Sequence, residues 1–369
     1  VYVEKGTSVY FTTPSELAET LQEIKPTFFA TVPRVLEKVY ARILERTEGL
    51  TGVKKALGLW AIRLAEQFEL GKEPTGLARL KYKIADKLVF EKWRQALGGN
   101  VRFAMCGGAA LNARLANFFG AAGIPIYQGY GLTETSPIIT YNWPGHNRAG
   151  TVGEPLPGLE VRIAEDGEIL TRGPHVMQGY YKNEEMTREV LSDDGWFHTG
   201  DIGAFTEDGY LRITDRKKAL FKLSTGKYVM PQPLENRLGV EGLVEYAVVM
   251  GVGRKFCTAL IFPEQDAVRA FAKAQGLDGD GSIKDLLRHP RILTQYQKLV
   301  DKANEGMDHW STIKRFALIS TILSVENGLL TPTLKVKRSK VRKAFEKELE
   351  AIYEEADQER KPHLGIATS

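Results

Sequence analysis

Strands and helices alternate along the first third of this chain, and that alternation most constrains its fold. Residues 101–105 predict a strand, a glycine-rich turn follows, and a helix is expected from about Asn112. Residues 124–127 predict another strand directly after that helix. Strand, helix and strand in succession are typical of a parallel sheet covered by helices. The sequence therefore predicts an α/β core, whose glycine turn is either a plain tight turn or a place where backbone N–H groups meet a ligand.

A mostly helical stretch interrupts this alternation. Residues 27–32 predict a buried strand, and Pro33 suits the first turn of the helix that follows. From about residue 50 to 97 the pattern is helical, and we interpret it as an insert on the α/β core. One apolar stripe of the insert favours core packing, with contact at a membrane surface as the alternative. The stripe consists of Leu57, Trp60, Ala61 and Leu64.

Asp-Gly pairs punctuate short apolar runs in the middle of the chain, at Asp166-Gly167 and Asp208-Gly209. Such pairs are hairpin signals, so residues 142–214 predict a small antiparallel β subdomain. After Asp215 the chain becomes α/β again. Strands are expected there at residues 246–250, 258–262 and 316–323, and the last helix at residues 339–356.

Composition excludes several classes of protein. The net charge of +4 over 369 residues is too small to indicate a nucleic-acid binder. Cys106 and Cys257 lie far apart in the sequence, which argues against a disulfide framework and fits buried thiols in a reducing compartment. No apolar run approaches the ~20 residues that span a bilayer. We therefore expect a cytoplasmic protein, with peripheral contact at a membrane surface left open.

Four polar motifs follow one another in the chain. The first comes directly after a predicted strand and combines an aromatic ring, a glycine, a hydroxyl and a carboxylate. These groups suit stacking on a purine, close backbone approach, contact with phosphate and binding of Mg²⁺. The motifs are Tyr130-Gly131-Leu132-Thr133-Glu134-Thr135, Gly195-Trp196-Phe197-His198-Thr199-Gly200-Asp201, Asp215-Arg216-Lys217-Lys218, and Thr331-Pro332-Thr333-Leu334-Lys335-Val336-Lys337-Arg338.

In this order, the motifs resemble the adenylate-forming superfamily of acyl-CoA synthetases, peptide-synthetase adenylation domains and luciferases. Residues 32–38, 222–231 and 330–335 are similar to the AMP-forming long-chain fatty acyl-CoA synthetases in particular. The resemblance implies that residues 1–214 are the C-terminal part of a large adenylation domain, followed by a hinge at residues 215–220 and a small mobile α+β domain over residues 221–369. The superfamily's Ser/Thr/Gly-rich phosphate loop is not found in these residues. We therefore expect an N-terminally truncated chain that is inactive alone.

The implied activity is ATP-dependent ligation of a long-chain fatty acid to CoA. The carboxylate attacks the α-phosphorus of ATP, giving acyl-adenylate and pyrophosphate, and the CoA thiol then displaces AMP. The implied cofactors and partners are ATP, Mg²⁺, CoA and the fatty acid. Such chemistry depends on positioning and charge neutralisation. Two alternatives remain, a carrier-protein thiol as the acceptor and a non-catalytic fragment.

The resemblance also implies roles for single residues that contact the nucleotide. His198 is given no proton-transfer role, although it lies within the second motif. The implied contacts are Gly107, Gly108 and Ala109 near adenine and the acyl carboxylate, Tyr130 stacked on adenine beside Gly131, Thr133 on phosphate, Glu134 on Mg²⁺, Asp201 on the ribose hydroxyls, and Arg216 on ribose or phosphate.

The mobile domain carries the remaining implied roles. Lys335 is the expected catalytic cation, which neutralises the α-phosphate and carboxylate, with Lys337 as a neighbouring candidate. The superfamily's usual glycine before this lysine is Leu334 here, which puts the shape of the loop in question. Lys218 is the expected pivot of the hinge. Lys222 and Gly226 are expected to face the site during transfer to CoA.

Overall fold

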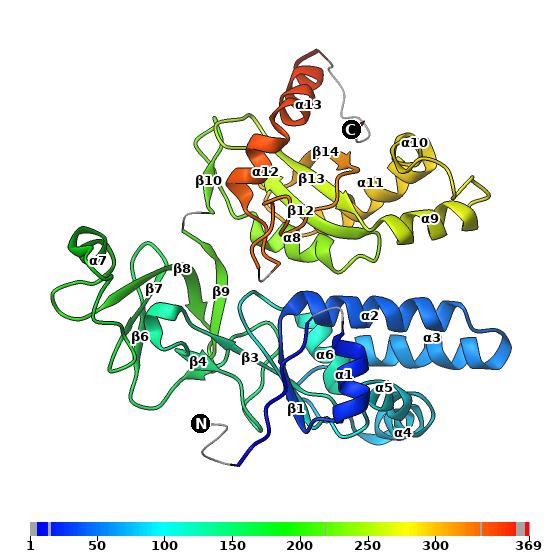
Figure 1. Cartoon of the computed structure of the whole chain (residues 1–369), viewed down its shortest axis with the longest axis horizontal. Coiled ribbons are helices and arrows are strands. Elements are labelled where there is room, and N and C mark those ends of the chain that lie inside the picture. Colours follow the sequence, from blue (N-terminus) through cyan, green and yellow to red (C-terminus); the bar gives the residue numbers. More distant parts are fainter. Residues whose placement is uncertain (1–5, 14–15, 218, 333, 359–365, 369) are drawn as a thin grey trace. The chain divides into compact units, whose positions relative to one another are not determined.

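The computed structural model describes residues 6–13, 16–217, 219–332, 334–358 and 366–368 (Figure 1). The chain divides into two compact units. Unit 1 comprises residues 1–164, 169–199 and 204–213, and unit 2 comprises residues 165–168, 200–203 and 214–369. Each unit has hydrophobic clusters of its own.

Unit 1 contains a five-stranded sheet with the order β1-β2-β3-β4-β5. The strands are β1 (Phe28–Thr31), β2 (Phe103–Cys106), β3 (Ile126–Tyr130), β4 (Thr140–Tyr141) and β5 (Glu154–Pro155). The first three are parallel and the last two continue the sheet in antiparallel sense. The predicted α/β core is therefore confirmed. The carboxyl ends of β2 and β3 meet at one edge, where folds of this kind bind their ligands.

Helices pack around this sheet and account for the predicted helical stretch. They are α1 (Leu17–Ile24), α2 (Pro33–Glu48), α3 (Gly52–Glu66), α4 (Gly76–Ala85), the π-helical turn η1 (Asp86–Phe90), α5 (Glu91–Ala96) and α6 (Ala113–Ala121). Pro33 is the first residue of α2, as predicted, and the Asn112 side chain caps α6 by accepting the Arg114 N–H at 2.9 Å. The α3 stripe is buried at Ala61 and Leu64, so core packing is confirmed for it.

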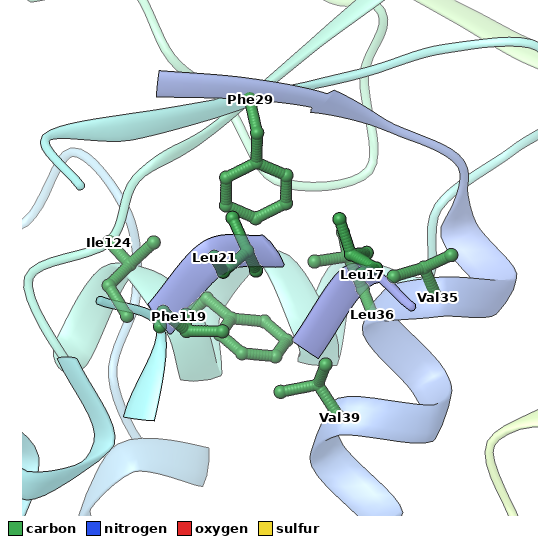
Figure 2. A pocket seen from close by; sticks show the side chains of 9 residues that line it. Leu17, Leu21, Phe29, Val35, Leu36, Val39, Phe119 and Ile124 are labelled. Carbon is green, nitrogen blue, oxygen red and sulfur yellow. The ribbon is translucent and has the colours of Figure 1, made fainter. Parts of the chain in front are cut away.

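An apolar pocket lies where α1, β1, α2 and α6 converge. Figure 2 shows Leu21, Phe29 and Phe119 turned toward one another across it. The lining is wholly apolar, and the cavity measures about 10 Å³, roughly one water-sized sphere. It is therefore a small packing gap, far too narrow for an acyl chain.

A second sheet, in the order β6-β7-β8-β9, follows the first. Its strands are β6 (Glu160–Ile163), β7 (Glu168–Arg172), β8 (Phe197–Phe205) and β9 (Leu211–Arg216). Gly167 and Gly209 of the two Asp-Gly pairs have φ values of +83° and +86°, so the predicted hairpins form there. The sequence did not predict α7 (Glu184–Val190), a short helix whose first turn is capped by the Asn183 side chain.

Unit 2 contains a four-stranded sheet with helices on both faces. The elements are the hairpin β10 (Phe221–Lys222) and β11 (Tyr228–Val229), the sheet strands β12 (Val244–Met250), β13 (Cys257–Pro263), β14 (Ile313–Ile319) and β15 (Ile366–Thr368), and the helices α8 (Gln232–Gly239), α9 (Gln265–Ala274), α10 (Ile283–Arg288), α11 (Pro290–Asn304), α12 (Arg338–Ala344) and α13 (Glu346–Gln358). Every residue of β13 is buried, because alternate side chains enter two separate hydrophobic clusters.

Two predictions about unit 2 need correction. The strand expected at residues 316–323 is β14, which ends at Ile319. The single helix expected at residues 339–356 is wrong, because α12 ends at Ala344 and α13 begins at Glu346. Phe345 has non-helical angles, φ −118° and ψ 33°, and its ring packs edge-on against Phe262 in the core. Burial of this ring accompanies the break in the helix.

Both cysteines are free and buried, as the sequence predicts. Burial raises the pKa of Cys106 and of Cys257 to about 12, which keeps both thiols protonated and unreactive. In the described part of the chain, no helix has the length and apolar character needed to cross a membrane.

Candidate functional site

The glycine turn after β2 lies beside the end of β3. The Gly107 N–H donates to the Thr31 carbonyl at 3.3 Å, and a Cβ added to Gly107 would lie 3.9 Å from the Gly129 carbonyl oxygen. Gly108 has a φ of +80°, a conformation that favours glycine. Gly108 and Ala109 are exposed. The turn is thus accessible at the edge of the sheet where a ligand is expected.

The Thr135 hydroxyl holds the segment after β3 in place. The Leu132 N–H donates to the Thr135 hydroxyl at 2.9 Å, and that hydroxyl lies 3.0 Å from the Pro137 carbonyl. A Cβ on Gly131 would lie 1.7 Å from the same Pro137 oxygen, so any other residue would displace the loop. Gly131 is therefore required by the turn itself. Thr133 is left exposed and Glu134 half-buried.

Tyr130 is more deeply packed than a stacking role suggests. Only 8% of the residue is exposed, and it belongs to a hydrophobic cluster with Ile139 and Val152. Its backbone carbonyl accepts the Ile139 N–H at 2.8 Å. Most of the Tyr130 side chain is therefore packed inside its own unit, and stacking of its ring on adenine stays a prediction.

Tyr180 is a neighbour of Glu134 that the sequence did not single out. Its hydroxyl donates to Glu134 Oε1 at 2.9 Å, and the Met177 N–H donates to the Glu134 carbonyl at 2.8 Å. Desolvation and the adjacent carboxylate raise the pKa of Tyr180, so the phenol stays protonated and can act as a donor. The contact joins residues 46 positions apart. No spacing rule of helices or strands relates positions so distant, so no sequence signal could have found this pair.

Glu134 suits a magnesium site in which it is the single protein ligand. Among the described residues there is no cluster of three or more His, Cys, Asp or Glu side chains able to hold a metal ion. Mg²⁺ is commonly held by one or two carboxylates together with substrate phosphates. The half-buried Glu134 suits that arrangement as a single protein ligand beside a nucleotide.

Asp201 and Arg216 form an ion pair within unit 2. Arg216 Nε donates to Asp201 Oδ1 at 2.8 Å, across the neighbouring strands β8 and β9. The Asp201 side chain is nearly buried, whereas that of Arg216 is mostly exposed. The pair therefore presents a cation at the surface of the sheet, held by a buried carboxylate.

Lys335 lies in a tight turn. The backbone of Leu334 in this turn shows how leucine stands where the superfamily usually has glycine. Thr331 closes the turn, since its N–H donates to the Lys335 carbonyl at 2.8 Å and its hydroxyl accepts the Lys335 N–H at 3.0 Å. Leu334 has a φ of +59°, the left-handed conformation that glycine adopts without strain. Leucine tolerates it here while packing partly against the core. The loop thus has the backbone that a glycine would favour.

The Lys335 ammonium lies within electrostatic reach of the Asp201–Arg216 pair. Desolvation and the positive charge of Arg216 lower the pKa of Lys335, and the Asp201 carboxylate partly opposes them. Unit 2 therefore brings together three of the residues that the sequence predicted for ribose and phosphate.

Lys222 and Gly226 lie on one small hairpin of unit 2. Lys222 ends β10, with Nζ 5.5 Å from the centre of the Tyr228 ring, and Gly226 has a φ of +86° in the turn before β11. Both residues are exposed. The hairpin is therefore accessible, and its expected contact with CoA stays a prediction.

Several basic residues follow Lys335 in the chain, and Arg338 among them has a structural role. Arg338 makes two hydrogen bonds to the Glu235 carboxylate, at 2.6 and 2.7 Å, and a third to the Val249 carbonyl at 2.7 Å. Its guanidinium thus joins α12 to α8 and β12. Lys337 is half-buried at the start of α12, and Lys340 is exposed.

The predicted hinge, residues 215–220, begins within β9, which ends at Arg216. Lys217 Nζ contacts Asp166 at 2.6 Å and Glu168 at 3.0 Å, so the start of this segment is tied to the turn before β7. Lys218, the predicted pivot, lies outside the described residues. Its role stays a prediction.

Asp215, the first residue of the predicted hinge, is a buried acid. The residue is 2% exposed; its Oδ1 accepts the Arg216 N–H at 2.6 Å, whereas Oδ2 is buried with no hydrogen-bond partner among the described residues. Desolvation raises the pKa of Asp215 to about 6. The ionised carboxylate is therefore disfavoured in the folded protein.

We expect Asp215→Asn to stabilise the protein above pH 6. Because the folded pKa is raised, the cost of the charge is present above pH 6 and disappears as the pH falls from about 6 toward 4. A shift of this size corresponds to about 2–3 kcal/mol. Urea unfolding at pH 8 should show the gain and unfolding at pH 4 should not. Asp193→Asn, at an exposed position, is the matched control, and an Asp215→Asn protein less stable at pH 8 would contradict the expectation.

Comparison with known proteins places these features in a family. The family model "AMP-binding enzyme" matches residues 1–181, and "AMP-binding enzyme C-terminal domain" matches residues 219–357. The long-chain-fatty-acid–CoA ligase FadD15 of Mycobacterium bovis is 40% identical over 91% of this chain and 56% of its own length. Long-chain-fatty-acid–CoA ligase 6 of Homo sapiens is 34% identical over 91% of this chain and 49% of its own length. The chain thus spans about half the length of these curated relatives.

Solved structures show the same fold at lower identity. The A-PCP didomain of the carboxylic acid reductase from Segniliparus rugosus, in complex with AMP, matches 95% of this chain and 44% of its own, with a TM-score of 0.67 and 23% identity. The anthranilate CoA ligase AuaEII, in complex with anthranoyl-AMP, matches 92% of this chain and 54% of its own, with a TM-score of 0.62 and 20% identity. From the two family models, which together match most of its length, the chain belongs to the AMP-binding enzymes.

Proposed function

We propose that this chain takes part in ATP-dependent ligation of a long-chain fatty acid to CoA. The arrangement of Lys335 near Asp201 and Arg216 carries the proposal, because this chemistry needs a cation beside an anionic nucleotide. The identity of 40% to a long-chain-fatty-acid–CoA ligase supports the choice of substrate. Two free and buried thiols support a cytoplasmic location.

The reaction would proceed in two steps. A carboxylate oxygen attacks the α-phosphorus of ATP and pyrophosphate leaves, which gives an acyl-adenylate. The CoA sulfur then attacks the acyl carbon and AMP leaves, which gives the thioester. Lys335 would neutralise charge at the α-phosphate, while Asp201 and Arg216 would orient the ribose. Magnesium, held by Glu134, would supply charge neutralisation at the phosphates.

Pyrophosphate release across fatty acids of different chain length tests this proposal. The assay needs a protein that extends these residues to the length of their relatives, with CoA or a carrier-protein thiol as the acceptor. We expect release that depends on a long-chain acid, followed by thioester formation with CoA. Release with no preference for long chains would contradict the substrate, and transfer only to the carrier protein would contradict the acceptor.

We expect Lys218→Pro in the extended protein to slow thioester formation more than adenylation. Proline fixes φ and removes an N–H, so it restricts the backbone on which a change of domain orientation depends. Measuring the two half-reactions separately checks this. Lys218→Ala, which removes the same charge and leaves the backbone free, is the matched control. Equal losses in both half-reactions would argue against a hinge at this position.

A further inference from the structure

The helix α4 and the turn η1 carry an apolar stripe on their outer face. Leu77, Leu80, Ile84 and Leu88 are 79%, 55%, 44% and 42% exposed. Spacings of three and four residues place such side chains on one face of a helix. The opposite face is already used for packing, since Ala85 and Val89 are buried. The outer stripe is therefore not part of the surface by which α4 packs against its own unit.

Exposed cations flank this stripe on both sides. Arg79, Lys81, Lys83, Lys87 and Lys92 are all exposed, and none of them forms an ion pair with a described residue. The same stretch contains two acids, Asp86 and Glu91, of which Asp86 is paired with Arg94 at 2.5 Å. The surface thus combines aliphatic side chains with a surplus of unpaired positive charge.

We propose that the outer face of α4 and η1 docks on the surface of an anionic lipid bilayer. The four aliphatic side chains would enter the boundary between headgroups and acyl chains, while the lysines keep their ammonium groups among the lipid phosphates. Protein interfaces are depleted in lysine, whereas helices lying on membranes are rich in it beside an apolar stripe. The composition of this face therefore favours lipid over a protein partner. The inference does not depend on the activity proposed above.

Sedimentation of the 369-residue chain with vesicles tests the docking surface. We expect binding to phosphatidylcholine vesicles that contain phosphatidylglycerol to be at least about ten-fold tighter than to phosphatidylcholine alone, and to weaken as salt is added. The double variant Leu80→Asp/Ile84→Asp should lose about ten-fold or more of this binding. Lys83→Glu/Lys87→Glu should lose most of the preference for the anionic lipid.

Ile322→Asp is the matched control, because Ile322 is 56% exposed on unit 2. It should bind vesicles as the unchanged chain does, and circular dichroism shows whether each variant is folded. Absent binding, equal binding to both kinds of vesicle, or an effect of Ile322→Asp equal to that of Leu80→Asp/Ile84→Asp would overturn the proposal. A dimer in solution that dissociates in the Leu80→Asp/Ile84→Asp variant would also overturn it, since a second copy would then cover the face.

Discussion

Lys335→Ala, in a protein extended to the length of its relatives, should slow adenylation by about 10²–10³ while leaving ATP affinity nearly unchanged. Hydrogen bonds between Thr331 and the Lys335 backbone hold this side chain within electrostatic reach of the Asp201–Arg216 pair, so its charge is positioned before the substrate arrives. Such a group stabilises charge that develops during the reaction and contributes little to binding of the ground state. Single-turnover pyrophosphate release and a separate ATP titration measure the two quantities.

Lys340→Ala is the matched control, because it removes the same charge from an exposed position in α12. We expect it to change neither the adenylation rate nor ATP affinity. Lys337→Ala tests the neighbouring candidate. A Lys335→Ala protein whose ATP affinity falls as much as its rate would show a binding role and contradict the assignment.

The lowered pKa of Lys335 adds a dependence on pH. A lysine whose pKa is lowered loses its charge at a lower pH than an ordinary lysine, whose pKa is about 10.4. As the pH is raised, the adenylation rate should therefore fall at a lower pH than it would if Lys335 titrated as an ordinary lysine. Lys335→Arg keeps the charge at all accessible pH values and should remove this decline.

Glu134→Gln should reduce adenylation by about 10² and raise the Mg²⁺ concentration needed for half-maximal ATP binding. The substitution keeps the shape of the side chain and removes the charge that would face the metal ion. Tyr180→Phe should have a smaller effect, about ten-fold or less, because it removes only the hydrogen bond that orients the carboxylate. Calorimetric titration of ATP at several Mg²⁺ concentrations separates metal binding from the rate.

Glu184→Gln is a suitable control, since Glu184 lies exposed on α7. An unchanged Mg²⁺ requirement in Glu134→Gln would remove this carboxylate from the list of metal ligands. If Tyr180→Phe changed protein stability but not the Mg²⁺ requirement, the Tyr180 contact would be structural only.

Local patterns predicted the elements that carry their own signals. Pro33 begins α2, Asn112 caps α6, and the Asp-Gly pairs form hairpins, because each depends on residues within one or two turns of chain. The order of the motifs was sufficient to indicate the family. The sequence missed α7 and the break at Phe345, since short helices and helix ends depend on capping and core packing more than on periodicity.

The sequence by itself determined the α/β core, the family and the chemical types of the proposed site residues, because these follow from periodicity and from the order of motifs. Only the tertiary structure decided which residues meet. It joined Tyr180 to Glu134, buried Asp215, gave Leu334 a left-handed backbone and turned one apolar stripe inward on α3 and another outward on α4. The physical reason is that burial, pKa and hydrogen bonding depend on neighbours far away in the chain, and folding alone brings those neighbours together.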